Sequence, residues 1–519
     1  MKYIQLLTLL FISMYSYAQP GTLDNNFDAN GIVTLDFFGD TDYAYDMHIQ
    51  PDGKIVVCGT TRNGSSSGDD LYVVRINPDG SLDNTFGSNG LAHVSRTGVQ
   101  KANALAIQAD GKVVVGGRTV ASGGSGEDFY IVRFNTDGSL DPNFGTAGQV
   151  VHQVGLSNDE ITDIAILPDG KIIAIGRSSG FEGVDIALVR FNPDGSIDNS
   201  FSFDGQVVTD VAGDDEIGDF YLQDNGKITA IGYVSDGSDE VLVIRYNADG
   251  VLDDSFGSNG VVLLDVMTTL QYPKAIAVTP AGEIIIVIAA GSWSNPDILL
   301  VRLLSDGTLD NSFSFDGIVQ ADFGLNETPS DMLIQPDGKI LVVGLSEDVG
   351  FDNEMALFRY NADGIIDNSF GTNGRVITPV GGSDRFTSVS LQEDGKIVAS
   401  GNCSSLFDSS VRDVCIARYL SGINIGIGEV DAYIGSTLIY PNPITDNSIT
   451  VEYELKSDET VSIELYDLSG KQVSVLQTAR DEKANSYQKT LSLPTLSAGN
   501  YLLKLNTDKG AVSVKLMVN

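Results

Sequence analysis

The sequence predicts an all-β protein: a seven-bladed β-propeller, closed by its own N-terminal strand, followed by a small immunoglobulin-like antiparallel β-sandwich. Three observations support this: a repeat of constant period, strand-and-turn patterning inside each repeat, and half a repeat at each end of the repeat region. The predicted limits are a signal peptide at 1–18, the propeller at 19–422, a linker at 423–436 and the sandwich at 437–519.

The repeat is marked by a glycine that precedes Lys or Glu just ahead of an apolar run, and successive copies lie 56 to 59 residues apart. An arginine inside a second apolar run follows the same period. The glycines are Gly53, Gly111, Gly170, Gly226, Gly282, Gly338 and Gly395, and the arginines are Arg75, Arg133, Arg190, Arg245, Arg302, Arg359 and Arg418. Such a period is typical of a propeller or an array; a linear β-solenoid is the alternative, although its turns are usually roughly 20–30 residues long.

Each repeat contains four short strand-like segments, for example "YDMHIQ", "KIVVCG", "LYVVRIN" and "LAHV" in the first complete copy. These runs are rich in Val, Ile, Phe and Tyr, and Gly, Asn, Asp and Pro bound them. The pattern is that of strands and turns, and it lacks the 3.6-residue period of helices. The recurring Asn-x-Asp-Gly suits a tight turn, because Asn and Asp bond their own backbone and Gly accepts positive φ.

The repeat region begins and ends in the middle of a unit. Residues 21–37 match the second half of a repeat, whereas the last copy stops at Gly422, where that half should begin. We therefore expect residues 21–38 to complete the blade that contains Arg418. This pairing would close the ring and cover an edge that otherwise invites aggregation.

Two further positions recur in every copy and predict a structural ion pair with an aromatic neighbour. The Asp of "LDxxF" accompanies the arginine seven times, and the planar guanidinium binds a carboxylate in two places. These residues are Asp24, Asp83, Asp141, Asp198, Asp253, Asp310 and Asp367. The Phe of the same motif is expected to pack between blades: Phe27, Phe86, Phe144, Phe201, Phe256, Phe313 and Phe370.

An acid stands five residues before each of the seven arginines, at the point where a variable loop enters the third strand. The seven acids are Asp70, Asp128, Asp185, Glu240, Asp297, Glu354 and Asp413. They are expected on one rim, either as strand-start residues that bond loop amides or as an acidic rim that gathers cations. Calcium is the natural candidate for such a rim, since it prefers carboxylate oxygens. No cofactor is required by the pattern.

The loops between second and third strands differ in sequence from blade to blade more than the rest of the repeat does. Single aromatic residues lie in four of these loops: Phe181, Trp293, Phe351 and Phe407. Beside polar groups, such rings can stack on sugars or peptides, or they can cover the end of a blade. These four residues are the sequence-based candidates for ligand binding.

The net charge of −39, from 31 Lys and Arg against 70 Asp and Glu, argues against nucleic acid and anionic membranes as partners. Three Cys are too few for a disulfide framework. Cys403 and Cys415 flank the last variable loop, so a disulfide between them is plausible in an oxidising compartment, and Cys58 is expected to be a buried thiol. The three His lie in separate repeats, so the sequence does not favour zinc.

The N-terminus, "MKYIQLLTLLFISMYSYAQP", reads as a cleavable signal peptide. A retained anchor is the weaker alternative, because the apolar stretch is short. No other segment reaches the roughly 18 apolar residues of a transmembrane helix. We therefore expect an exported protein that keeps no membrane span after cleavage.

The pattern changes after Gly422, and period-two alternation is clear in "TVSIELYDL" and "AVSVKLMV". Short strands of this kind predict a small antiparallel sandwich. Residues 437–519 contain "YPNP", "LYDLSGK", "LSAGNY" and "SVKLMV", with motif positions Pro441, Asn442, Pro443, Gly470, Gly499, Tyr501 and Lys515. In these motifs the segment resembles the C-terminal sorting domain of cargo for the type IX secretion system of Gram-negative bacteria.

That resemblance implies Sec export, contact with the type IX secretion machinery, passage across the outer membrane, and cleavage of the domain with release or surface attachment. The repeats resemble the delta-60 type propeller repeat over residues 21–422, through "DGK" and "VVRxNxDGSLDxxFG". That family has no generally assigned chemistry. The fifth blade departs from the pattern, because Pro280-Ala281-Gly282-Glu283 stands in place of "PDGK".

The sequence favours a secreted or surface-displayed binding module for an extracellular glycan or protein. The alternatives are an exported carbohydrate-active enzyme, a lyase or hydrolase, and a purely structural surface protein. Paired carboxylates can cleave glycosidic bonds, but none stands out from the sevenfold background. No G-x-S-x-G, H-E-x-x-H or P-loop is present. The sequence therefore predicts no catalytic residue and makes an enzyme the less favoured class.

Overall fold

The computed structural model describes residues 19–62, 69–95, 98–120, 126–180, 183–236, 239–266, 270–292, 295–324, 326–347, 352–404, 411–422, 434–440, 444, 448–467, 472–496, 499–507 and 510–518. This part of the chain folds into two compact units, of which the first ends at Ser421 and the second begins at Gly422. The described residues include no helix with the length and apolar character needed to cross a membrane. The predicted signal peptide at 1–18 lies outside the described residues, as does 423–433 of the predicted linker.

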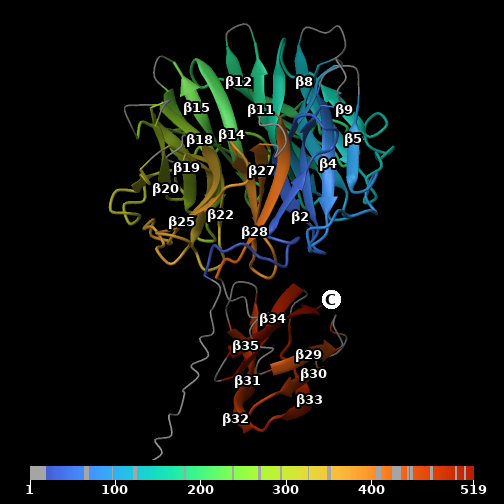
Figure 1. Cartoon of the computed structure of the whole chain (residues 1–519). Coiled ribbons are helices and arrows are strands. Elements are labelled where there is room, and N and C mark those ends of the chain that lie inside the picture. The colour runs from blue at the N-terminus through green and yellow to red at the C-terminus, as the bar shows by residue number, and fades with distance from the viewer. Residues whose placement is uncertain are drawn as a thin grey trace, which may run out of the picture. The chain divides into compact units, whose positions relative to one another are not determined.

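The first unit consists of seven four-stranded antiparallel sheets, which are the predicted blades. The innermost strands are β2 (Asp42–Ile49), β6 (Gln100–Ile107), β10 (Asp159–Ile166), β14 (Asp214–Leu222), β18 (Leu270–Val278), β22 (Glu327–Ile334) and β26 (Arg385–Leu391). The second strands are β3 (Ile55–Thr61), β7 (Val113–Val120), β11 (Ile172–Ser179), β15 (Ile228–Ser235), β19 (Ile284–Ser292), β23 (Ile340–Glu347) and β27 (Ile397–Ser404). Figure 1 shows the blades following one another in chain order, with β27 and β28 in orange beside β2 in blue.

The outer half of each blade is made of a long third strand and a short fourth strand. The third strands are β4 (Asp70–Ile76), β8 (Glu127–Phe134), β12 (Val184–Phe191), β16 (Asp239–Tyr246), β20 (Asn295–Leu303), β24 (Asn353–Tyr360) and β28 (Arg412–Tyr419). The fourth strands are β5 (Leu91–Val94), β9 (Gln149–His152), β13 (Gln206–Thr209), β17 (Val261–Leu264), β21 (Ile318–Ala321), β25 (Arg375–Thr378) and β1 (Ile32–Leu35). We call the side with the loops between second and third strands the loop face, and the side with the Asp-Gly turns the turn face.

The N-terminal segment closes the ring, as the half-repeats predict. Strand β1 pairs antiparallel with β28, with Ile32 opposite Ala417 and Leu35 opposite Val414. The last blade is therefore built from both ends of the repeat region, in the order β1-β28-β27-β26. The edge of β28 is covered by a strand of its own chain, which removes a site for pairing between molecules.

The core of the propeller lies between neighbouring blades. Strands such as β3 and β4 are buried on both faces along their whole length, which explains why each contains an uninterrupted apolar run and no alternation. At the closure, Val398, Val414 and Ile416 of the last blade share one apolar cluster with Met47 and Val57 of the first. Blade-to-blade packing therefore continues around the ring without a gap.

Every innermost strand carries a β-bulge at the same place. In the first blade the register shifts between Ala44 and Asp46, and the same shift recurs in the six other blades. A bulge leaves one extra residue out of the ladder and re-aims its neighbours. Because the innermost strands surround the axis, the bulges decide which side chains line the central channel.

The second unit is the predicted small antiparallel sandwich. One sheet contains β29 (Ile434–Tyr440), β30 (Ser448–Leu455) and β33 (Asn485–Ser492), and the other contains β32 (Gln472–Glu482), β31 (Glu459–Asp467), β34 (Gly499–Thr507) and β35 (Gly510–Val518). Alternating residues of both sheets, among them Val451, Ile463 and Leu503, form one buried cluster. The period-two alternation of the sequence thus corresponds to one buried face on each sheet.

Candidate functional site

A ring of arginine–aspartate pairs links the blades and accounts for the most regular feature of the sequence. In all seven blades the Arg Nε lies 2.7 to 2.9 Å from the Asp Oδ2, including the pair of Arg418 with Asp24 from the N-terminal segment. Each guanidinium also lies 4.3 to 4.7 Å from the ring centroid of the Phe in the same motif. The predicted structural ion pair is therefore confirmed.

The same arginines reach into the next blade. Arg75 Nη1 donates to the carbonyl of Thr136, at 2.7 Å, in the turn of the following blade. Burial raises the pKa of Asp83, but hydrogen bonds from Thr85 and Arg75 outweigh it and lower that pKa to about 2. The carboxylates of this ring are therefore ionised at every pH at which the protein is expected to be folded.

The seven predicted rim acids lie on the loop face, at the start of the third strands or within two residues of it. They are buried or half-buried. Burial, and then the like charge of Asp159 in the next blade, raise the pKa of Asp128. Two of the seven, Asp185 and Asp297, each gather with two further acids.

Several of the predicted site residues fall outside the part of the chain that the structure describes. These are the loop aromatics Phe181, Trp293, Phe351 and Phe407, and the sorting-motif residues Pro441, Asn442, Pro443 and Gly470. Of the other motif positions, Gly499 and Tyr501 lie in β34 and Lys515 lies in β35. Tyr501 stands between Asp467 and Leu516 on the neighbouring strands, so it sits in the middle of that sheet.

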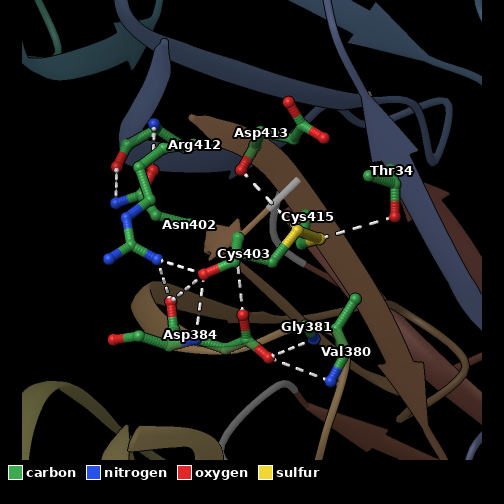
Figure 2. The surroundings of a disulfide bond; sticks show 12 residues. Thr34, Val380, Gly381, Asp384, Asn402, Cys403, Arg412, Asp413 and Cys415 are labelled. Atoms are coloured by element: carbon green, nitrogen blue, oxygen red, sulfur yellow. Dashed lines mark hydrogen bonds between the residues drawn. A yellow bond between two sulfur atoms is a disulfide. The ribbon is translucent and has the colours of Figure 1, made fainter. Parts of the chain in front are cut away.

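Cys403 of β27 and Cys415 of β28 form a disulfide, with their Cα atoms 5.9 Å apart. Figure 2 shows this bond beside the closing strand, where Thr34 Oγ1 lies 3.5 Å from the sulfur of Cys415. Asp384, at the start of the same blade, accepts hydrogen bonds from the amides of Val380 and Gly381. The bond thus ties two strands of the blade on which ring closure depends. Cys58 is a buried free thiol, and burial raises its pKa well above the ordinary value.

A ring of carboxyl groups lies inside the central channel, directly after the bulges. Four blades place an Asp there and three place Ala or Ser: Asp46, Ala104, Asp163, Asp219, Ala275, Asp331 and Ser388. All of them except Ala275 border a cavity of about 280 Å³. Three of the four Asp side chains accept a hydrogen bond from a backbone amide of the neighbouring blade, at 2.7 to 2.9 Å. The donors are Leu105 for Asp46, Ile276 for Asp219 and Val389 for Asp331.

The pKa values of three axial carboxyl groups are raised, which favours their protonated forms. Burial, and then the like charges of Asp219 and Asp46 across the channel, raise the pKa of Asp331 to about 8. Burial likewise raises the pKa of Asp219 to about 6 and that of Asp163 well above its ordinary value. Asp163 and Asp219 also hydrogen-bond to each other, which requires one of them to carry a proton. Repulsion in the channel is thus relieved by protonation.

Above this ring, the loop-face end of the channel carries a cluster of tyrosines and charged groups that differs from blade to blade. We call it the mouth cluster, and its members are Tyr43, Tyr45, Lys101, Arg118, Glu160, Arg177, Glu216, Tyr233, Tyr272, Lys274 and Arg385. The ammonium of Lys101 lies 5.0 Å from the ring centroid of Tyr45 and 3.4 Å from Glu160 Oε1. Arg177 continues the chain of contacts, at 2.9 Å from Glu160 and 3.2 Å from Glu216.

The other half of the mouth cluster has fewer acids. Tyr233 and Tyr272 meet edge to face, with ring centroids 5.4 Å apart. Lys274 lies beside them, at 5.7 Å from the Tyr272 centroid, and burial followed by the charge of Arg385 lowers its pKa. Within the described part of the chain, neither Lys274 nor Arg385 forms an ion pair with a carboxylate. Lys274 lies beside Tyr272 and the charge of Arg385 acts on Tyr45, in a chain whose net charge is −39.

Sequence reasoning missed the axial ring and the mouth cluster, although both leave a trace in the repeats. The axial Asp is visible in "YDMHIQ", "TDIAILP", "GDFYLQ" and "SDMLIQ", at one position of four first strands. The mouth shows the opposite signal, since the equivalent residues Tyr43, Lys101, Glu160, Glu216, Tyr272, Thr328 and Arg385 share no chemistry. The available clue was a position whose residue type varies among the seven repeats, close to positions whose residue type recurs.

The turn face also holds two exposed aromatic residues that the repeat did not predict. Phe203 and Phe315 are each 96% exposed, and their φ angles of 76° and 78° are unusual for a bulky side chain. They lie in the turns before β13 and β21. Because these turns follow the far ends of the third strands, both residues are on the side opposite the mouth cluster.

Comparison with known families agrees with this architecture. Residues 50–86, 108–144, 167–201, 223–256, 284–313 and 335–370 match the family described as "Domain of unknown function (DUF5122) beta-propeller". Residues 438–519 match the family described as "Secretion system C-terminal sorting domain". This chain carries DUF5122 propeller repeats and a type IX sorting domain. Both predicted resemblances are confirmed, and the sorting domain indicates export to the cell surface or the extracellular space.

Solved structures with a similar fold include PorZ of Porphyromonas gingivalis, described as an essential surface component of the type IX secretion system. It is 13% identical, with 94% of this chain and 60% of that chain covered and a TM-score of 0.44. Virginiamycin B lyase from Staphylococcus aureus is 13% identical over 74% of this chain and 98% of its own, with a TM-score of 0.43. The polysaccharide lyase Uly1 is 11% identical over 72% and 89%, with a TM-score of 0.45.

This chain spans only 60% of the length of PorZ. At these identities and scores, the similarities bear on neither activity nor ligand. No curated protein matches the chain.

Proposed function

We propose that the exported propeller is a binding module that takes an anionic extracellular glycan at the mouth cluster. The observation that carries this proposal concerns Lys274 and Arg385 beside the tyrosines of the channel mouth: among the described residues, neither cation has a carboxylate within ion-pair distance. The sorting domain accounts for its place outside the cell and for contact with the secretion machinery.

The chemistry of the mouth cluster favours a glycan that carries carboxylate or sulfate groups. Tyrosine offers an apolar ring face together with a hydroxyl, which matches the apolar face and hydroxyl rim of a pyranose. Lysine and arginine form charge-assisted hydrogen bonds with anionic oxygens. The acidic remainder of the surface repels an anionic polymer, so the local positive mouth would orient it onto this one site.

The alternative of a carbohydrate-active enzyme has one structural candidate, the carboxyl pair Asp163 and Asp219. The two groups hydrogen-bond directly to each other. Glycosidases separate their carboxyl groups by about 5–5.5 Å when they retain configuration and by about 6.5–9.5 Å when they invert it. A directly bonded pair leaves no room for the anomeric carbon or a water between its members, so this geometry favours a proton-sharing structural role.

The test measures binding of the chain lacking residues 1–18 to soluble polysaccharides by calorimetry. One uronate-rich, one sulfated and one neutral polymer should be compared, each at low and high salt. We expect binding of at least one acidic polymer, weakened by added salt. Lys274→Ala and Arg385→Ala should each reduce affinity about tenfold, since a lost charge-assisted contact costs about 1.5–3 kcal/mol.

Two sets of variants locate the site. Phe203→Ala and Phe315→Ala on the turn face are the matched aromatic controls and should bind as wild type does. Trp293→Ala and Phe351→Ala test whether the variable loops extend the site, as the sequence suggested. Equal binding of neutral and acidic polymers, or unchanged affinity in both cation variants, would overturn the proposal; capture of a protein ligand alone would redirect it.

A further inference from the structure

Two groups of three carboxylates lie in seams between neighbouring blades on the loop face. One group is Asp185, Asp210 and Asp215, and the other is Asp297, Asp322 and Glu327; in each, one oxygen from every residue lies within 4.8 Å of the other two. We call them the seam triads. The first acid starts a third strand, the second follows the fourth strand of that blade, and the third starts the innermost strand of the next blade.

Among the described residues, three carboxylate oxygens come this close together twice. Every member of the second triad lies 112 residues after its counterpart in the first, which is two repeat periods. The gradient of exposure is also the same, since the second acid is exposed and the third is buried in both triads. The two groups therefore occupy equivalent positions of the repeat, and the members of each come from two blades.

A buried oxygen in one triad lacks a partner. Asp297 is only 8% exposed, and its Oδ2 accepts a hydrogen bond from Gln320 at 3.0 Å. Its Oδ1 is buried, and no described residue donates to it. An orphaned charged acceptor costs on the order of 1–3 kcal/mol or more, and here it stands within a group of like charges. A ligand that supplies positive charge to this oxygen would remove both costs.

The electrostatics of both triads agree with this deficit. Burial, and the like charges of Asp210 and Asp185, raise the pKa of Asp215. Burial is also the main cause that raises the pKa of Glu327, to which the charge of Asp297 adds. In each seam the carboxylates therefore repel one another, and the exposed member makes the group accessible from solvent.

We propose that each seam triad binds one calcium ion, which joins two adjacent blades on the loop face. Three carboxylates supply hard oxygen donors, and Ca²⁺ accepts six to eight oxygens in a flexible arrangement that water can complete. Neither triad contains His or Cys, so the donor set does not suit zinc. The inference is independent of the glycan site, because no member of the mouth cluster belongs to a triad.

The two triads differ in one neighbour that predicts their relative affinity. Arg375 Nη1 lies 3.5 Å from Glu327 Oε1, whereas Leu263 occupies the corresponding position 112 residues earlier. The guanidinium offsets one of the three negative charges. We therefore expect the triad of Asp185 to bind calcium more tightly than the triad of Asp297, and Arg375→Leu to raise the affinity of the second.

Calorimetric titration of the chelator-treated chain lacking residues 1–18 with calcium chloride tests the proposal. We expect two sites, with dissociation constants on the order of 10⁻⁴–10⁻³ M as in other extracellular modules. Saturating calcium should raise the melting temperature by mass action. Asp210→Asn and Asp322→Asn change exposed residues, so the fold should persist while each variant loses one site or weakens it at least about tenfold.

Asp265→Asn is the matched control. Asp265 is exposed and equivalent to Asp210, but Gln271 takes the place of the third acid there, and Gln271 accepts from the amide of Val266 as Asp215 accepts from that of Val211. This variant should leave calcium binding unchanged. No calcium heat and no melting shift at millimolar calcium would overturn the proposal. So would an equal response to magnesium at matched ionic strength, or equal losses in Asp265→Asn and Asp210→Asn.

Discussion

The arginine–aspartate ring and the axial channel are built from the same seven repeats, yet they follow opposite rules. In the ring every blade supplies the same Arg, Asp and Phe in the same contacts. In the channel four blades supply Asp, three supply Ala or Ser, and the mouth above has no common residue. Strict repetition thus marks what holds the blades together, and departure from it marks where a ligand would bind.

The two regions also differ in how they treat charge. The ring neutralises each carboxylate with a buried guanidinium, so the pKa of Asp83 falls to about 2. In the channel, burial and the like charges of Asp219 and Asp46 raise the pKa of Asp331 to about 8, which favours its protonated form. Protonation of the ring carboxylates should therefore destabilise the protein in acid, and ionisation of the channel carboxyl groups should destabilise it in base. The comparison can thus be tested by pH as well as by substitution.

The largest effect should come from removing the closure on which the ring depends. Deleting residues 21–38 removes β1 and the carboxylate of Asp24, which leaves Arg418 buried without its partner and β28 with an open edge. We expect a clear loss of melting temperature and association of the molecules through the exposed strand. Calorimetry and size-exclusion chromatography measure both. An unchanged melting temperature with a monomeric product would contradict the closure.

A smaller but still large loss is expected from breaking one pair inside the ring. Asp253→Ala leaves Arg245 buried without its carboxylate, at a cost of about 3–5 kcal/mol in the free energy of unfolding. Chemical denaturation measures it, with exposed Asp254→Ala as the neighbouring control. A free energy equal to that of the wild type would show that the ring does not hold the blades.

The channel predicts a pH dependence of opposite sign. Because the pKa of Asp331 is near 3.8 when unfolded and about 8 when folded, the folded state binds more protons between these values. Stability should therefore fall as pH rises from about 4 to 8. Asp331→Asn removes this loss, so the melting temperature of the variant relative to the wild type should be higher at pH 9 than at pH 5, by roughly 2–4 °C for each kcal/mol.

Asp337→Asn, on an exposed turn, makes the same change of charge and is the control for that pH series. If both variants shift equally at pH 9, the effect is one of net charge, and the protonated axial ring is wrong.

The smallest effect tests the one blade that departs from the ring. In the six other blades, a Lys from the Asp-Gly-Lys turn, or its equivalent, lies 2.7 to 3.5 Å from the ring Asp. In the fifth blade Glu283 stands there and hydrogen-bonds to Thr279. Glu283→Lys should add about 0.5–1 kcal/mol to the free energy of unfolding. A neutral or destabilising result would show that this lysine contributes nothing to the ring.

Most of the fold could be predicted from the sequence because the residues that form and join the blades recur in every repeat. The period, the paired Arg and Asp and the half-repeats at both ends were enough to predict that Asp24 would meet Arg418. The mouth cluster was beyond this reasoning. Lys274 and Arg385 become neighbours only because bulged strands converge on an axis, and neither the bulge nor the convergence has a signature of its own.

The seam triads are an intermediate case. Asp185 and Asp297 were recognised as rim acids from their constant distance to the arginines. Asp210 and Asp322 were not, because they follow the fourth strand and occur in only some of the blades. Their approach to the rim depends on the packing of one blade against the next, which a pattern within a single repeat does not contain.

The most direct test of the central claim is a binding and melting comparison of the wild type with the double variant Lys274→Ala/Arg385→Ala. If the asymmetric mouth binds and the symmetric ring stabilises, the double variant should keep the wild-type melting temperature and lose affinity for an acidic polysaccharide by about 100-fold. Wild-type affinity in the double variant, or a large drop in its melting temperature, would contradict this division between the two regions.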